Sequence, residues 1–458
     1  MKSKKFVLAG LVLLAITMVL LPLAGCKNDT VPPEVEKQEQ GDGGGSETDK
    51  NNTAAKLVSI SVTPPERTVY SVEQEFDSTG MKVTATYDDK SQREVTGWTT
   101  DFGTVAGKKG LNKPVTVSYT EGDTSKSDTF TVTVFPKEVK VLTGYTSPNN
   151  TDSKWTYVEF GEWPQTEAVG FKPTTTPQSH GIFVDNYYVE GNDKYVEKDG
   201  QYYKVEPIVW RVLTTSYKAP EGGTVGNALL LAEKILTGGI PYYDVYNVDR
   251  TVGVTTIYPN NYEHSAVRAW LNGLEYPYKG PDDNVQTDKG DYFGKGFLQT
   301  AFTESARYLI APTTVDNSAA STIPSEITDK DLESYWNSGE NQYASKTLTM
   351  DKIFLLSEKE ATNSDYGFDE YDRWVGDDYG TTTSTRIRDT TDYAEATGAY
   401  PGDSSAGYGG WWWLRSPSYR DVYIARDVYI DGDAYNNISV INARGGVVPA
   451  LSISLTEN

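Results

Sequence analysis

Two apolar runs frame the last part of the chain: Gly409-Gly410-Trp411-Trp412-Trp413-Leu414-Arg415-Ser416-Pro417 and Gly446-Val447-Val448-Pro449-Ala450-Leu451. These two apolar runs enclose residues 418–444, which contain only Ser, Tyr, Arg, Asp, Val, Ile, Ala, Gly and Asn. Antibody binding sites favour the same polar and aromatic types, because Tyr supplies rigid contact area and Ser and Asn supply adaptable hydrogen bonds. The composition therefore predicts a ligand-binding surface.

A tandem hexamer lies inside this segment: Arg420-Asp421-Val422-Tyr423-Ile424-Ala425 is followed by Arg426-Asp427-Val428-Tyr429-Ile430-Asp431. Side chains of a strand alternate between its two faces, so a repeat of even length keeps the same residue types on the same face. We expect Val422, Ile424, Val428 and Ile430 to face inward, and Asp421, Tyr423, Asp427, Tyr429 and Asp431 to face outward. Gly432 and Asp433 then permit a turn. A loop within the segment would shift these faces.

The predicted ligand-contacting residues carry polar or aromatic side chains in and beyond the hexamer. They are Tyr419, Arg420, Asp421, Tyr423, Asp427, Tyr429, Asp431, Asp433, Tyr435, Asn436, Asn437, Ser439 and Asn442.

The first 25 residues are typical of a secretory signal. Lys2, Lys4 and Lys5 precede an apolar run at residues 6–21, and Leu23-Ala24-Gly25-Cys26 follows Pro22. A membrane helix is the alternative, but the run is short for a span. The last four residues resemble the lipobox of bacterial lipoproteins, which implies cleavage before Cys26 and acylation of this residue. Cys26 is the only cysteine, so the sequence excludes disulfides, thiolate–zinc sites and cysteine nucleophiles.

Residues 26–56 are rich in Gly, Pro and charged residues, a composition that cannot bury a core. We expect a flexible tether with a root-mean-square reach of roughly 30 Å. The whole chain has a net charge of −22. An acidic surface repels phosphate backbones, so we expect no nucleic-acid partner. The predicted location is extracytoplasmic, at the cell surface or outer membrane, with a membrane contact through the lipid.

Residues 57–136 contain short alternating runs at 58–62, 81–87, 115–119 and 129–134, separated by turns such as Asp88-Asp89-Lys90-Ser91. This pattern predicts an antiparallel β-sandwich. The motifs Thr68-Val69-Tyr70, Phe76-Asp77-Ser78-Thr79-Gly80-Met81-Lys82-Val83 and Phe130-Thr131-Val132-Thr133-Val134 resemble bacterial immunoglobulin-like domains. The resemblance implies a stalk.

Residues 141–458 read as one mixed α+β domain. Strands are predicted at 155–161, 208–213 and 228–232, and helices at 265–272, 305–310 and 391–396. Ser265 can cap the first helix and Gly273 can end it. Turn-rich stretches at 277–290 and 362–385 are typical of a fold that carries binding loops.

The motifs at residues 262–272, 352–357, 392–394, 412–417 and 446–451 resemble an uncharacterised bacterial family related to formylglycine-generating enzymes. Members are similar to the C-type-lectin-fold variable proteins of diversity-generating retroelements. The resemblance implies a multidomain protein in which an all-β immunoglobulin-like sandwich precedes an α+β C-type-lectin-like domain. One departure is Val448, where the relatives are expected to carry Arg.

Retroelement diversification mutates adenines, and an Asn codon can then become Tyr, Asp, Ser, Ala, Ile, Val, Gly or Arg. Every residue of the segment 418–444 is either Asn itself or a member of this set. An ordinary Tyr- and Asp-rich surface hairpin is the alternative, and ligand binding is compatible with both.

Catalysis and metal binding find little support in the sequence. The formylglycine-generating relatives rely on cysteines that this domain lacks, and His180 and His264 are the only histidines. Ala406 breaks the Gly-x-Ser-x-Gly pattern at residues 402–407, which favours a loop. We expect no cofactor and no metal, with no calcium loop motif present. Residues 411–413 favour a core over a sugar-stacking platform.

The sequence therefore favours a surface-anchored protein that binds a protein or glycan ligand and is not an enzyme. A glycan-degrading enzyme and a structural envelope lipoprotein remain the alternatives, since acidic pairs are numerous.

Overall fold

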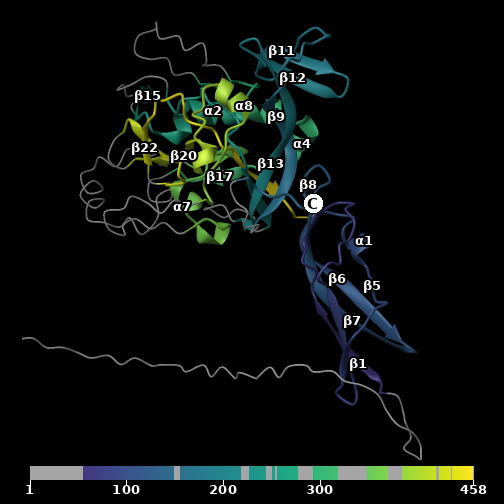
Figure 1. Ribbon diagram of the computed structural model, residues 1–458. Helices are drawn as coiled ribbons and strands as arrows, with labels where there is room; N and C mark the ends of the chain where they lie inside the picture. The colour runs from purple at the N-terminus through teal and green to yellow at the C-terminus, as the bar shows by residue number, and fades with distance from the viewer. Residues whose placement is uncertain are drawn as a thin grey trace, which may run out of the picture. The chain divides into compact units, whose positions relative to one another are not determined.

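A computed structural model of the chain (Figure 1) describes residues 55–148, 155–217, 226–243, 250–252, 255–276, 292–317, 348–369, 384–418, 422–434 and 436–456. Several predicted features lie outside these ranges: the signal, Cys26, nearly all of the tether, Tyr419, Arg420, Asp421, Tyr435, the stretch 277–290 and much of the stretch 362–385. Strands make up 45% of the described residues and helices 13%, which confirms a largely β protein with several sheets. Within the described ranges, no helix is long and apolar enough to cross a membrane.

Two sheets enclose a first apolar core at residues 57–134. One sheet has the order β1-β3-β4, with β1 at Leu57–Thr63, β3 at Lys82–Tyr87 and β4 at Gln92–Glu94. The other has the order β2-β7-β6-β5, with β2 at Val69–Ser71, β7 at Thr124–Phe135, β6 at Gly110–Glu121 and β5 at Thr99–Thr100, followed by α1 at Phe102–Val105. Burial alternates along β3, where Val83, Ala85 and Tyr87 are buried. β2 pairs parallel to β7, which departs from the predicted antiparallel arrangement.

A nine-stranded sheet lies within a second apolar core, residues 135–455, which we call the head. Its main path is β10-β11-β12-β13-β14-β23-β19, and β9 pairs with β13 and β8. The strands are β8 at Lys140–Val141, β9 at Thr156–Glu167, β10 at Gln178–His180, β11 at Phe183–Glu190, β12 at Asp193–Lys198, β13 at Gln201–Tyr217, β14 at Asn227–Ala232, β19 at Ile353–Phe354 and β23 at Ala450–Ser454. The three strands predicted in this domain correspond to β9, β13 and β14.

β23, the final strand, lies between β14 and β19. Leu451 pairs with Leu230 of β14 on one side and with Ile353 of β19 on the other. All three residues are fully buried. A strand that is covered on both faces has a continuous apolar run instead of an alternating one, which explains the sequence of β14.

The helices of the head are short, and several of them lie against this sheet (Figure 1). α2, at Ala266–Asn272, begins and ends as predicted: the Ser265 hydroxyl accepts a hydrogen bond from the Arg268 N–H, and Gly273 has φ +66°. The predicted helices at 305–310 and 391–396 correspond to α4 at Glu304–Leu309 and α8 at Asp392–Ala396. Other elements are η1 at Tyr262–His264, α3 at Phe297–Ala301, α7 at Glu358–Ala361, η2 at Ser364–Tyr366 and η3 at Ser404–Ala406. Two small sheets pair β15 at Arg250–Val252 with β16 at Thr255–Ile257, and β17 at Thr313–Val315 with β18 at Thr349–Asp351.

The three consecutive tryptophans belong to the core. Trp412 and Trp413 are fully buried and Trp411 is 5% exposed. This confirms the core prediction and rules out a sugar-stacking platform at these positions, since such a platform must face solvent.

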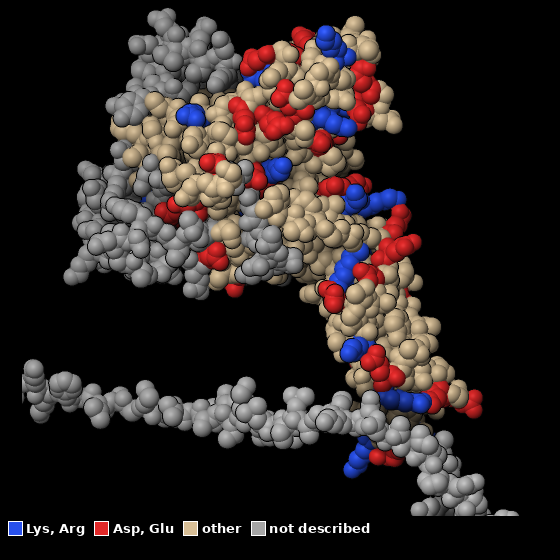
Figure 2. All heavy atoms as spheres, in the orientation of Figure 1, with Lys and Arg blue, Asp and Glu red and all other residues tan. Residues whose placement is uncertain are grey.

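The surface carries charges of both signs. On the face shown in Figure 2, basic side chains lie among acidic ones, in line with 42 basic and 64 acidic residues in the chain. Ion pairs such as Lys140 with Glu159 are partly exposed, so each contributes at most about 1 kcal/mol to stability.

Leu451→Ala is expected to lower the free energy of unfolding of the head by about 2–5 kcal/mol, because it leaves a cavity in the apolar core that the Leu451 side chain fills. Chemical denaturation followed by tryptophan fluorescence measures this change, since every Trp except Trp98 lies beyond residue 141. Leu348→Ala is the control, because Leu348 is 39% exposed. An equal loss in both variants would contradict the central place of β23.

Candidate functional site

The predicted binding segment forms a three-stranded sheet of order β20-β21-β22, which we call the C-terminal sheet. β20 spans Trp412–Pro417, β21 spans Ile424–Val428 and β22 spans Asn436–Ser439. Trp412 pairs with Val428, and Ala425 pairs with Ile438. β21 is therefore the middle strand, held against the buried tryptophans on one side and β22 on the other.

The predicted alternation fails along β21. Ala425, Arg426, Asp427 and Val428 are all fully buried, one after another. The prediction that Asp427 faces outward is therefore wrong. Both faces of this middle strand are covered. Buried and exposed side chains alternate only in a strand with one solvated face, so no alternation is expected here.

A buried ion pair lies beneath β21. Arg426 Nε is 3.2 Å from Glu358 Oε2, and both side chains are at most 1% exposed. Glu358 is the first residue of α7, and its backbone N–H donates to the Ser416 hydroxyl of β20 at 2.8 Å. Burial of charged groups is expensive unless they are paired, so this pair holds α7 and the C-terminal sheet in one arrangement. Sequence reasoning missed Glu358, because nothing local links it to the hexamer.

Arg415 forms a second buried tie between the C-terminal sheet and α7. Its Nη1 donates to Glu360 Oε2 and, at 2.8 Å, to the Leu355 carbonyl. Burial alone would lower the pKa of Arg415, but the charge of Glu360, the hydrogen bond to it and the neighbouring Tyr217 and Tyr262 together raise that pKa. Arg415 therefore stays charged and keeps β20 attached to α7.

Arg386 holds the turn that follows β21, at residues 429–433. Its Nε donates to the Gly432 carbonyl at 2.7 Å, and its Nη1 donates to the Asp369 carbonyl at 2.8 Å. Gly432 has φ +87°, a conformation that glycine adopts without strain. The turn predicted at Gly432 and Asp433 is confirmed, and a buried guanidinium fixes its position.

The exposed part of the segment gathers at this 429–433 turn. Tyr429 is 40% exposed, and Asp431 and Asp433 are partly exposed. Tyr408, 39% exposed, lies beside the turn, because the neighbouring Gly409 N–H donates to the Ile430 carbonyl at 2.9 Å. The sequence analysis missed Tyr408. The glycines around it were the available signal, because glycine often marks a close approach of two backbone segments. A Cβ at Gly409 would come within 2.4 Å of the Arg388 carbonyl oxygen.

Other predicted contact residues lie at the opposite end of β21. Tyr423 and Ser439 are partly buried beside the start of the strand. Tyr423 is six residues before Tyr429, roughly 20 Å along an extended chain at 3.3–3.4 Å per residue. Asn442 is also partly buried, and its side-chain oxygen accepts the Arg444 N–H at 2.9 Å. The backbone of Asn436 and Asn437 forms part of β22. The structure thus brings together Tyr429, Asp431 and Asp433, and separates them from Tyr423 and Ser439.

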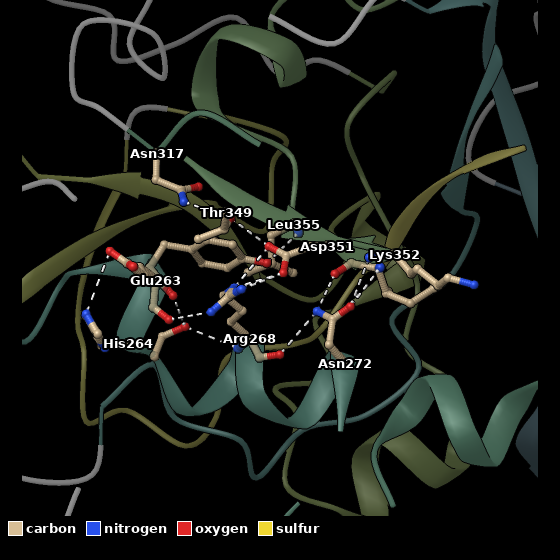
Figure 3. Close-up of polar contacts among 12 residues, drawn as sticks. Glu263, His264, Arg268, Asn272, Asn317, Thr349, Asp351, Lys352 and Leu355 are labelled. Carbon is tan, nitrogen blue, oxygen red and sulfur yellow. Dashed lines mark hydrogen bonds and ion pairs between the residues drawn. The ribbon is translucent and has the colours of Figure 1, made fainter. Parts of the chain in front are cut away.

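A second polar network, around α2, ties this helix to β18 and β19 (Figure 3). Arg268 reaches both carboxylate oxygens of Asp351 at 2.8–3.0 Å and also donates to the Glu263 carbonyl. Asn272 donates to the Ile353 carbonyl and accepts from the N–H groups of Lys352 and Ile353. These groups are saturated by one another, so the network acts as a structural joint.

The two histidines lie in separate surroundings. His180 Nε2 contacts the Thr300 carbonyl at 3.0 Å, and His264 Nε2 is 3.7 Å from Glu263 Oε2. Among the residues that the structure describes, no three His, Cys, Asp or Glu side chains form a group that could hold a metal.

Glu358→Gln is expected to reduce the stability of the head by about 3–5 kcal/mol, because it removes one charge of a buried pair. Glu162→Gln is the matched control: its partner Lys194 is 37% exposed, so the expected loss is below about 1 kcal/mol. Urea denaturation followed by tryptophan fluorescence measures both. A loss below about 1 kcal/mol for Glu358→Gln as well would show that the pair does not hold α7 to the sheet.

Comparison with known proteins identifies a family for most of the head. No curated protein matches the sequence. The family model described as "Domain of unknown function (DUF6273)" matches residues 225–455, from the start of β14 to the end of β23. This range covers half of the chain and includes the C-terminal sheet, so the chain belongs to the DUF6273 family.

Proposed function

We propose that the protein is a lipid-anchored, extracytoplasmic binding protein whose C-terminal sheet contacts a protein or glycan ligand through the 429–433 turn. The observation that carries this proposal is the contrast between an exposed turn and the buried frame that fixes it. Tyr429 is 40% exposed, whereas Arg426 and Asp427 directly before it are fully buried.

This contrast is what a preorganised contact surface requires. A loop that is fixed before binding loses less conformational entropy when the ligand arrives. Arg386 and the Arg426–Glu358 pair fix the backbone, while Tyr429 and Tyr408 offer aromatic rings that have few rotatable bonds. Aromatic side chains of this kind dominate the energetics of binding sites.

The apolar cores of residues 57–134 and 135–455 support an immunoglobulin-like stalk followed by a C-type-lectin-like head. Two sheets around one core, with period-two burial in β3, favour an immunoglobulin-like stalk at residues 57–136. A head whose final strand lies inside the main sheet, beside a small sheet that carries the exposed turn, favours a C-type-lectin-like domain. The stalk and the tether would raise this domain above the membrane to which Cys26 is acylated. Cys26→Ser would release the protein from membranes if this anchor is correct.

We also propose that the segment 418–444 is diversified by a retroelement. The DNA around the gene tests this directly. A near-copy of the terminal coding segment that differs only at adenines, next to a reverse-transcriptase gene, is the expected finding. Its absence would leave a fixed binding surface and remove the diversification proposal.

Tyr429→Ala is expected to weaken ligand binding at least tenfold, corresponding to about 1.4 kcal/mol or more. The melting temperature should stay within about 2 °C of the wild type, because the side chain is partly exposed. Printed arrays of glycans and of purified bacterial and host surface proteins provide the ligand, and titration of the strongest hit against each variant measures the loss.

Tyr308→Ala is the matched control, because Tyr308 is 79% exposed on α4. Equal binding by wild type, Tyr429→Ala and Tyr308→Ala would place the contact surface elsewhere. Chemical turnover of an array glycan would instead identify an enzyme.

A further inference from the structure

Arg388 is a buried arginine that the proposed binding surface does not use. It lies in the chain shortly before α8, and its side chain is fully buried in the head. Its backbone carbonyl accepts the Gly410 N–H at 2.9 Å, directly before the three tryptophans. Its guanidinium lies close enough to Arg211 and Glu233 for both charges to act on it.

Glu233 is already engaged by other groups. Arg211 donates to it through Nε and Nη2 at 3.0 and 2.9 Å, and the Ser147 hydroxyl donates to the same carboxylate. Arg211 also stacks on the Trp155 ring at 3.9 Å and donates to the Thr385 carbonyl. The Arg211–Glu233 pair is therefore complete without Arg388.

Among the described residues, only Nη1 of the Arg388 guanidinium has hydrogen-bond acceptors. Nη1 donates to the carbonyls of Ile387 and Thr385, at 3.0 and 3.4 Å. Within the described part of the chain, Nε and Nη2 are buried and have no hydrogen-bond acceptor. These two nitrogens form the same edge of the guanidinium with which Arg211 holds Glu233. A buried donor without an acceptor costs roughly 1–3 kcal/mol, and more when it is charged.

The charges of this cluster do not balance among the described residues. Two guanidinium groups, from Arg211 and Arg388, face the single carboxylate of Glu233. Burial, followed by repulsion from Arg211, lowers the pKa of Arg388 to about 9, so the group is still charged at neutral pH. Burial alone would raise the pKa of Glu233, but Arg388 and Arg211 together lower it.

We propose that the Nε–Nη2 edge of Arg388 binds a planar oxyanion of the carboxylate type, either a small free carboxylate or the carboxylate end of a larger ligand. Such an anion accepts two parallel hydrogen bonds from this edge, as Glu233 does from Arg211. It also supplies the missing negative charge. A spherical anion such as chloride fits this fork less well. Within the described part of the chain, the Arg388 guanidinium makes no hydrogen bond to the 429–433 turn, so the site goes beyond the proposed function.

Thermal unfolding of the full chain in sodium formate tests this inference, with sodium chloride replaced stepwise by formate at constant ionic strength. Wild type is expected to gain roughly 5 °C in melting temperature along a saturable curve, because formate binds only the folded state. Arg388→Lys keeps the charge but lacks the two-nitrogen edge, so the gain should disappear. Arg307→Lys, half-buried on α4, should keep it. The same formate curve for wild type and Arg388→Lys would overturn the inference.

A measurement on the wild type alone covers the case in which Arg388→Lys does not fold. The [13C]formate NMR signal should broaden saturably in the presence of protein, and acetate, but not chloride, should reverse the broadening. No saturable broadening would overturn the inference. Stabilisation by benzoate as strong as that by formate would identify the carboxylate of a larger ligand, and stabilisation by formate and acetate only would identify a small free carboxylate.

Discussion

The pairing of β23 between β14 and β19 is the constraint on which the rest of the head depends. Leu451 meets Leu230 on one side and Ile353 on the other, so the end of the chain is enclosed by strands that are distant in sequence. Directly before β23, Gly446 pairs with Trp412 and Val447 with Thr237. Both ends of the segment 418–444 are therefore fixed to the core.

Buried arginines connect this core to the C-terminal sheet and its exposed turn. Arg386 holds the Gly432 carbonyl, Arg415 holds α7, and Arg426 faces Glu358. A guanidinium has five donors in a rigid plane, so it fixes direction as well as distance. Polar ties of this kind add little net stability compared with apolar packing. We infer that they select one arrangement of the C-terminal sheet.

Local signals in the sequence predicted local structure. Ser265 and Gly273 marked both ends of α2, and the tryptophans at 411–413 indicated a core. The burial of Asp427 could not be predicted, because it depends on both neighbouring strands and on α7. The split of the predicted contact residues between the two ends of β21 was missed for the same reason. Alternation predicts the two faces of a strand, whereas strand order decides whether either face meets solvent.

The separation of a fixed frame from an exposed contact surface is the central claim. Saturation mutagenesis of residues 422–434, read on each variant for folded cell-surface display and for binding to the strongest array ligand, tests it most directly. Substitutions of Tyr429 and Asp431 should reduce binding while display is retained, and substitutions of Arg426 and Asp427 should reduce both together. If the loss of binding follows the loss of display at every position, the frame and the contact surface are not separate.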